Sequence, residues 1–130
     1  MQINILAVVV AALSTFLVGG LWYSPVLFGN LWNQANGSQG KAGQGHPARV
    51  FGLSFLSALI AALAYALIMP VPATFLDAAL QGLLVGAGIV GMAFSINYQF
   101  ANRNATLLMI DGGYHALQFC LYGIIIGLWR

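Results

Sequence analysis

The sequence predicts an all-α integral membrane protein: a four-helix transmembrane bundle with a short interfacial helix after the first span. Apolar residues make up 61% of the chain and charged residues only 5%, whereas a soluble domain is about 25% charged. Four apolar stretches approach or exceed the roughly 20 helical residues that cross the hydrocarbon layer. Because these spans use most of the 130 residues, we expect residues 1–130 to form a single transmembrane domain. The composition excludes a water-soluble globule and a disordered chain.

The span boundaries are predicted from the apolar runs and from residues that start or stop helices. The spans cover about residues 3–22, 48–69, 75–98 and 105–129. Pro25 ends the first span, and the Pro-Val-Pro turn at 70–72 ends the second, because proline cannot continue a helix. Thr74 and Asp77 have the spacing of a capping box at the start of the third. The first run lacks a basic start and a clear cleavage site, so we expect a retained helix and not a signal peptide.

Two segments between the first and second spans have patterns of their own. Ser24 is a suitable cap and Pro25 suits a first helical position. The apolar side chains that follow, as far as Trp32, fall on one helical face, which predicts a helix lying in the membrane interface. Residues 33–47 are rich in Gly, Gln, Asn and Ser, so they are predicted to form a flexible polar loop.

The few basic residues predict the orientation of the spans. Three of the four Lys and Arg residues lie in or beside the loops at 33–47 and 101–104, and the fourth is Arg130. Basic residues favour the cytoplasmic side, so both loops are expected there and both termini outside. Trp22 and Trp129 each end a span, where an indole ring suits the interface. No basic stripe is present, so we expect membrane lipid and no nucleic acid as a partner.

Small residues recur at four-residue spacing along every predicted span. Such rows let transmembrane helices approach closely, which does more for their association than burying leucine. The glycines that we single out are Gly19, Gly82, Gly86, Gly112, Gly123 and Gly127. We expect these rows mainly to pack the helices of one chain. The alternative is that the Gly123–Gly127 row faces a second copy or another membrane protein.

Asp111 and His115 are the candidate functional residues inside the membrane. They lie four positions apart on the last span and therefore share a face. At about 1.5 Å per residue His115 lies about 15 Å into the helix, near the bilayer centre, where ionisable groups are expensive and often functional. The candidate polar intramembrane site consists of Asp111, Tyr114, His115, Gln118 and Asn97. It is either a proton-responsive or substrate-binding site, or a hydrogen-bond network that keeps the helices in register.

Other kinds of site have less support. A metal centre needs three or four ligands, and Asp111 with His115 supplies two. A hydrolase built from these residues and a serine of the second span would lack the strained turn that presents a nucleophile. We therefore expect no metal, no cofactor and no enzymatic activity.

Two stretches resemble a known family. Residues 20–29, which contain Trp-Tyr-Ser-Pro and are followed by Trp32, form the first, and residues 110–117, which contain Gly-Tyr-His, form the second. Together they resemble the bacterial membrane proteins catalogued as domain of unknown function 1761. The resemblance implies a small four-helix protein of the bacterial inner membrane with no assigned activity. Its motif positions here are Trp22, Tyr23, Ser24, Pro25, Tyr114 and His115.

Two functions are compatible with these observations. The first is a binding or assembly subunit that packs with itself or with a larger membrane complex, and the small-residue rows favour it slightly. The alternative is a compact homo-oligomeric transporter or proton-linked permeation unit that uses Asp111 and His115.

Overall fold

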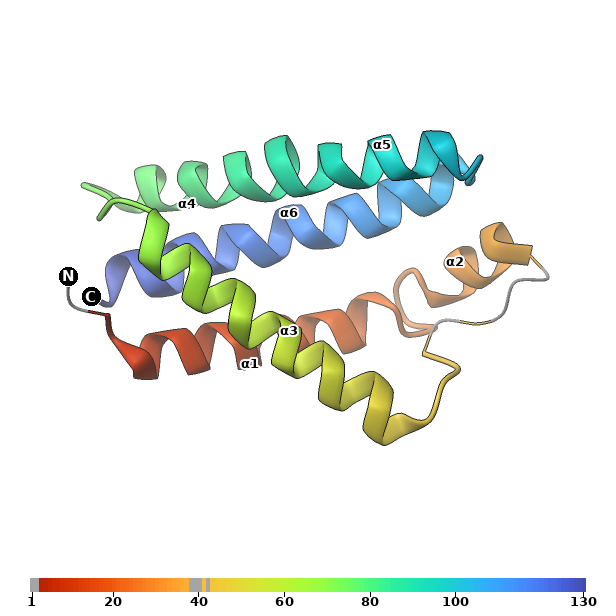
Figure 1. Cartoon of the computed structure of the whole chain (residues 1–130), viewed down its shortest axis with the longest axis horizontal. Coiled ribbons are helices and arrows are strands. Elements are labelled where there is room, and N and C mark those ends of the chain that lie inside the picture. The colour runs from red at the N-terminus through yellow and green to blue at the C-terminus, as the bar shows by residue number, and fades with distance from the viewer. Residues whose placement is uncertain (1–2, 38–40, 42) are drawn as a thin grey trace.

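The computed structural model describes residues 3–37, 41 and 43–130, and within these the chain is entirely helical apart from turns and loops. The helices are α1 (Ile5–Trp22), α2 (Gly29–Asn36), α3 (Pro47–Ile68), α4 (Phe75–Leu83), the π-helix η2 (Leu84–Gly91), α5 (Met92–Phe100) and α6 (Ala105–Leu128). Because α4, η2 and α5 follow one another without a break, they form a single rod (Figure 1). The ends of the four long helical units lie within two residues of the predicted span ends.

Polar side chains fix the starts of the long helices. Each accepts a hydrogen bond from a first-turn amide that has no partner within the helix. Asn4 caps α1, His46 caps α3, Thr74 caps α4 and Asn104 caps α6. The Thr74 cap, with its hydroxyl 3.1 Å from the Asp77 amide, is the one predicted from the sequence.

The short helix predicted to start at Ser24 and Pro25 starts later, at Gly29. Residues 23–28 form a turn instead, in which the Ser24 carbonyl accepts a hydrogen bond from the Gly29 amide at 2.9 Å. A Cβ atom at Gly29 would lie 2.3 Å from the carbonyl oxygen of Tyr23, so glycine is required at this close approach. The prediction failed because the turn satisfies backbone groups that a helix would otherwise use.

The predicted loop at 33–47 is also shorter than expected. Helix α2 continues to Asn36, so the first four residues of that segment are helical. The helix ends where Gly37 adopts a φ of +63°, a conformation that favours glycine. Residues 38–40 and 42 of the predicted loop lie outside the described residues.

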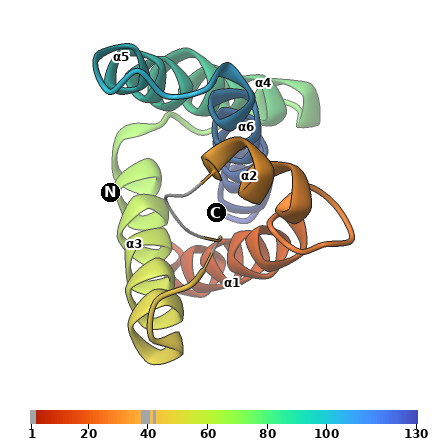
Figure 2. The same ribbon diagram turned by 90° about the vertical axis from the view of Figure 1, so that its right-hand side faces the viewer.

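Helix α6 forms the centre of the bundle. It lies between α1 and the α4–α5 rod and packs against both, while α3 crosses α1 on one side (Figures 1 and 2). The core lies where α1, α3 and α6 meet, and Ala62, Tyr65 and Tyr122 are buried in it. Towards its start α3 diverges from the bundle, and its first two turns are exposed on most sides (Figure 1).

Glycines bring the α4–α5 rod into backbone contact with α6. A Cβ atom at Gly82 would lie 2.1 Å from the Phe119 carbonyl oxygen, and one at Gly86 would lie 2.4 Å from that of His115. Gly123 approaches α4 in the same way, since its Cβ atom would lie 2.2 Å from the Ala78 carbonyl oxygen. These close approaches explain why the predicted small-residue rows lie in these helices.

Gly123 and Gly127 pack within the chain, as the main expectation for these rows had it. Gly127 packs against Pro72 of the same chain, and Gly123 is buried under α4, so the Gly123–Gly127 row does not face outwards. The alternative in which this row meets a second copy is therefore wrong for this structure. Gly112 differs from the expectation, because a Cβ atom there would find no atom of the described residues within 4 Å.

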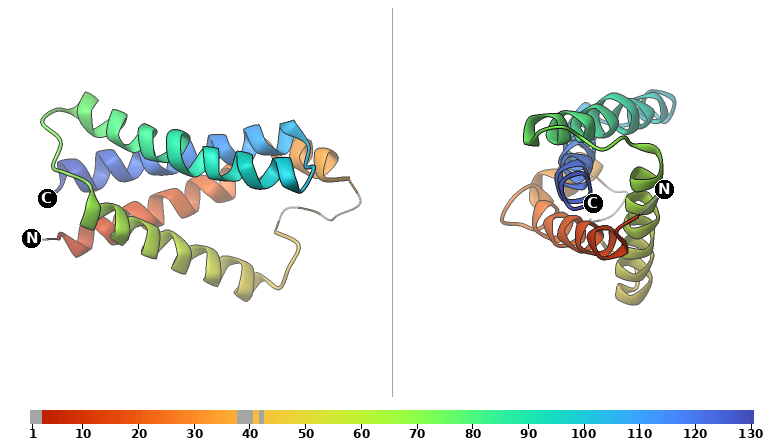
Figure 3. Two further views of the ribbon diagram at one scale, coloured as in Figure 1. Left: turned by 45° about the horizontal axis from the view of Figure 1, so that its top comes forward. Right: turned by 90° about the vertical axis from the view of Figure 1, so that its left-hand side faces the viewer.

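The two ends of the bundle hold the segments that the sequence assigned to opposite sides. At one end Arg103 donates a hydrogen bond to Asn36, which joins the loop after α5 to the end of α2. At the other end the Asn4 side-chain amide donates to the Trp129 carbonyl at 2.8 Å, and both termini lie there (Figure 3).

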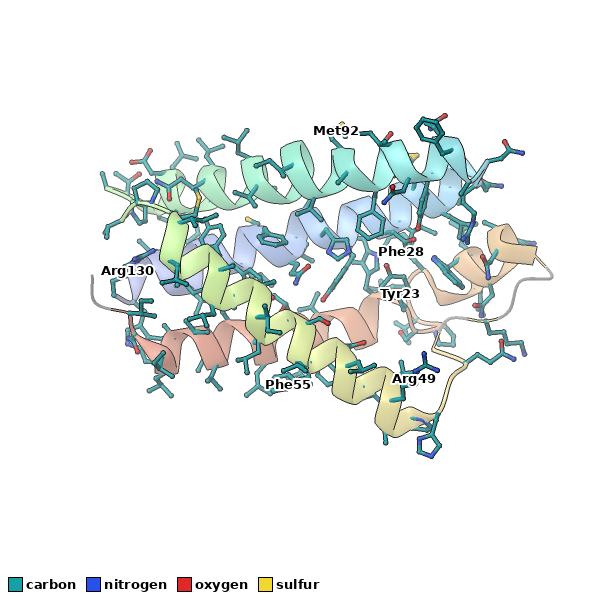
Figure 4. The ribbon with its side chains drawn as sticks, in the orientation of Figure 1. Tyr23, Phe28, Arg49, Phe55, Met92 and Arg130 are labelled. Carbon is teal, nitrogen blue, oxygen red and sulfur yellow. The ribbon has the colours of Figure 1, made fainter. Side chains whose placement is uncertain are left out.

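The outer surface is strongly apolar. Large side chains on the outer side of the rod are more than half exposed, among them Phe75, Leu84, Ile89, Met92, Ile96 and Phe100. Figure 4 shows Met92 pointing away from the other helices. Three of the helical units, α1, α3 and the α4–α5 rod, are long and apolar enough to cross a membrane.

Candidate ligand-binding cleft

Asp111 accepts hydrogen bonds from three different elements. The Tyr23 hydroxyl donates to Oδ1 at 2.5 Å, and Trp32 Nε1 donates to the same oxygen at 3.0 Å. The Tyr98 hydroxyl donates to Oδ2. We call these four residues the Asp111 clasp. It joins α6 to the turn after α1, to α2 and to α5, and it leaves the Asp111 side chain only 8% exposed.

The end of α1 is fixed to α6 beside the clasp. Trp22 Nε1 donates to the Ile110 carbonyl at 2.9 Å. Its ring lies over Gly113, where a Cβ atom would come within 3.2 Å of it. This anchor directs Tyr23 inwards, between α1 and the other helices (Figure 4). Burial first, and then the hydrogen bond to Asp111, raise the pKa of the Tyr23 hydroxyl, so Tyr23 keeps its proton and acts as the donor.

Arg103 supports the clasp from outside. Its guanidinium lies over the Tyr98 ring, 5.6 Å from the centroid, and donates to the Asn36 side chain. The first contact is a cation–π interaction with a clasp residue, and the second fixes the end of α2. Arg103 therefore helps to hold α2 and α5 in place around Asp111.

His115 starts a second hydrogen-bond chain along α6. Its Nδ1 atom lies 2.6 Å from the Gln118 Oε1 atom, and Gln118 Nε2 donates to the Tyr122 hydroxyl at 2.8 Å. Tyr122 donates in turn to the Ala58 carbonyl of α3 at 2.8 Å. The Phe94 ring stacks on the imidazole at 4.8 Å between centroids. This chain runs from His115 into the core between α1, α3 and α6.

Tyr114 fixes the other side of α6 to α1. Its hydroxyl donates to the Thr15 carbonyl at 2.8 Å. Gly19 makes room for it, because a Cβ atom there would lie 3.0 Å from the Tyr114 hydroxyl. The two neighbouring residues therefore have different roles. Tyr114 contributes to the contact between α6 and α1, whereas His115 lies against the rod.

A cleft of about 990 Å³ opens between α1, the first half of α3, the rod and α6. Its walls are mainly apolar and aromatic, with Phe16, Phe51 and Phe94 from three different elements. The polar groups that line it from α6 are Asp111, His115 and Gln118, and Ser54 and Ser57 face them from α3. A mainly apolar cleft with a few convergent polar groups is the usual form of a small-molecule site.

The comparisons with known proteins identify the family. A family model described as a protein of unknown function (DUF1761) matches residues 6–127. The chain belongs to this family. The match includes both the Trp-Tyr-Ser-Pro and the Gly-Tyr-His stretches. No curated protein and no solved structure matches the chain significantly.

In this DUF1761 chain the predicted polar residues separate into two networks. Asp111 and His115 take different hydrogen-bond partners, the clasp for Asp111 and Gln118 for His115. Both nevertheless line the same cleft, as do Tyr114 and Gln118. Asn97 is exposed and lies outside that lining. Its neighbour Tyr98 donates to Asp111 in its place.

The motif residues of the DUF1761 stretch at 22–32 have distinct roles. Trp22, Tyr23 and Trp32 bind α6, whereas the Ser24 hydroxyl donates to the Leu21 carbonyl at 2.6 Å and shapes the turn. Pro25 is exposed in that turn, and Trp129 is exposed at the far end of α6. In the sequence Tyr23 is a motif position and Trp32 lies in the predicted interfacial helix, and neither of them nor Tyr98 is predicted to belong to the polar site. One pattern in the sequence could have indicated Tyr98. It lies four residues after Phe94, so the two aromatic side chains share one face of α5, and this face points inwards.

Proposed function

We propose that the chain crosses the membrane four times, with α6 as the fourth span. The 24 residues of α6 exceed the roughly 20 that a span requires. Its polar side chains Asp111 and Gln118 are buried within the protein, where an intramembrane polar group is tolerated. In this arrangement α2 lies in the interface, with its Leu31 and the preceding Leu27 of the turn exposed towards lipid.

The same proposal assigns the two ends of the bundle to the two sides of the membrane. The end with Arg103, Lys41 and Arg49 faces the cytoplasm, because basic residues favour the cytoplasmic side of a membrane. The end with both termini faces outwards. The membrane proposed is the inner membrane of a bacterium.

The function that the geometry supports best is binding and movement of a small amphiphilic molecule. The observation that supports it is the cleft, where apolar walls meet the polar groups of Asp111, His115 and Gln118. A ligand with an apolar body and a polar group matches both halves of such a site. In this proposal the protein is a compact transporter or carrier, and it is not an enzyme.

The assembly function has less support. Its proposed surface, the Gly123–Gly127 row, is occupied by α4 and Pro72 of the same chain. Native mass spectrometry of gently extracted particles distinguishes the two functions. A homo-oligomer supports the transporter, whereas a stoichiometric foreign chain supports an assembly subunit.

Trp32 provides an internal reporter for ligand binding, because it lines the cleft. We expect a neutral single-chain amphiphile with a brominated tail to quench Trp32 fluorescence saturably in purified protein. Ser57→Phe should weaken the saturable part, because Ser57 lines the cleft and a phenyl ring there occupies part of it. Ile60→Phe is the matched control, since Ile60 lies on the same helix, is 60% exposed and is not part of the lining.

Equal saturable quenching in wild type and Ser57→Phe would contradict the proposal. A Trp32→Phe variant identifies the reporter, because the saturable component should disappear with that indole ring. The remaining quenching then comes from Trp22 and Trp129 in contact with the bulk amphiphile.

A further inference from the structure

The fixed charge that lines the cleft is negative. Among the described residues that line it, Asp111 is the only one with an acidic or basic side chain other than histidine. The chain has two acidic residues in all, and the other, Asp77, lies in the first turn of α4 at the far end of the bundle. The polar wall of the cleft is therefore anionic.

The clasp orients the Asp111 carboxylate without neutralising it. All three of its donors, Tyr23, Trp32 and Tyr98, are neutral groups. Three donors and no acceptor match an ionised carboxylate, which can only accept hydrogen bonds. A full negative charge in a partly desolvated site attracts a positive charge far more strongly than it would in water.

The nearest basic group in this network is engaged elsewhere. Arg103 contacts the Tyr98 ring and donates to Asn36, and it is not part of the cleft lining. Lys41 and Arg49 are exposed and also lie outside the lining (Figure 4 shows Arg49 at the outer end of α3). A cation that enters the cleft therefore meets the carboxylate without a competing charge on the walls described.

The aromatic walls favour the same kind of ligand. Rings from α1, the following turn, α2, α3, α5 and α6 line the cleft, namely Phe16, Tyr23, Trp32, Phe51, Phe94 and Tyr114. The face of an aromatic ring attracts a cation, and the attraction grows when water is excluded. A cleft of about 990 Å³ is at the upper end of the range for drug-sized ligands.

We propose that this cleft binds lipophilic organic cations, which place their positive charge beside Asp111 and their apolar body among the aromatic side chains. The proposal rests on the proposed function and specifies the ligand class of the same site. A cation that partitions into the membrane reaches the cleft from its open side, between the first half of α3 and the rod. The carboxylate and the rings then replace part of its hydration.

A pair of probes with one shape and opposite charge tests the proposal. Tetraphenylphosphonium and tetraphenylborate both carry four phenyl rings, and they differ in the sign of the fixed charge. Binding is measured on the purified full chain in non-ionic detergent at pH 8.5, where an ordinary histidine, with a pKa of about 6.5, is neutral. The same detergent without protein gives the baseline for unspecific partitioning of each probe, and Ser57→Phe, with its narrowed cleft, should bind less of each probe than wild type.

We expect wild type to bind the phosphonium about tenfold or more tightly than the borate, as a single desolvated charge pair implies. Asp111→Asn keeps the size of the side chain and should remove this preference. Ser54→Lys keeps the clasp intact and adds a positive charge to the opposite wall, so it should lower phosphonium binding by a similar factor. Gly52→Lys is its matched control, because Gly52 is exposed on the same helix outside the lining.

Each outcome decides the proposal. Equal or tighter binding of the borate to wild type overturns it, as does an unchanged preference in both Asp111→Asn and Ser54→Lys. If neither ion binds while the neutral brominated amphiphile still quenches Trp32 saturably, the cation proposal fails and the proposed function stands. If no probe binds above the detergent baseline, both fail.

Discussion

Two tyrosines in the core, Tyr65 and Tyr122, differ in how their hydroxyl groups are satisfied. Both are at most 2% exposed, and their rings lie 6.3 Å apart. The Tyr122 hydroxyl bonds to Gln118 and to the Ala58 carbonyl, whereas the Tyr65 hydroxyl has no partner among the described residues. A buried hydroxyl without a partner costs free energy, and one with partners stabilises the fold.

The expected effects of removing these two hydroxyls therefore differ. Tyr122→Phe should lower the free energy of unfolding by about 1–3 kcal/mol, because it leaves Gln118 and the Ala58 carbonyl without their partner. Tyr65→Phe should leave stability unchanged or raise it slightly, since no hydrogen bond is lost. Denaturation of both variants in the same detergent, followed by circular dichroism, measures the difference. A larger loss in Tyr65→Phe than in Tyr122→Phe would refute this assignment.

At the scale of helices, contact between α6 and the rod depends on glycine at defined positions. Gly123 and Gly112 lie on the same helix, but only Gly123 approaches a neighbouring backbone, at 2.2 Å for an added Cβ atom. Gly123→Ala should therefore destabilise the bundle by about 1–3 kcal/mol through overpacking. Gly112→Ala should be neutral or stabilising, because alanine is the better helix former and the space is open. Thermal unfolding of the two variants compares them directly, and equal melting temperatures would show that the rod can move away without cost.

At the scale of the whole molecule, four spans require that α6 crosses the membrane. Asn102 lies before α6 and Arg130 after it, and both are exposed. In a Cys120→Ser background, Asn102→Cys and Arg130→Cys should react with an impermeant maleimide from opposite sides of the membrane. Gln44→Cys should react from the same side as Asn102→Cys, because the Asn36–Arg103 hydrogen bond joins these segments at one end. Labelling of the Asn102 and Arg130 positions from one side would exclude a spanning α6.

The sequence predicts the parts of the fold that depend on local residues. Apolar length predicts the spans, the Thr74 spacing predicts a cap, and four-residue spacing predicts Gly82 and Gly86 at a helix contact. Asp111 is predicted to be buried because a carboxylate inside the membrane requires partners. The identities of those partners, Tyr23 and Tyr98, depend on helix rotation and on the turn after α1. No local sequence pattern determines the helix rotation or the conformation of that turn. The divergence of α3 that opens the cleft also depends on contacts between distant parts of the chain.

The π-helix η2 keeps a long row of residues on one side of the rod. Ala78, Gly82, Gly86, Val90, Phe94 and Tyr98 follow one another at intervals of four, and all are buried or half-buried. In a regular α-helix each interval of four turns the row by about 40°, which would accumulate to about 200° over the whole row. The wider i→i+5 turns of η2 counteract this drift over residues 84–91.

Because of this angular correction, the rod can place its glycines against α6 at one end and Tyr98 in the Asp111 clasp at the other end. Without it, a rod that presents Gly82 to α6 would turn Tyr98 towards lipid. Removing one residue from 84–91 would rotate α5 by about 100° relative to α4. The length of that segment, more than the identity of its residues, therefore determines whether the clasp can close.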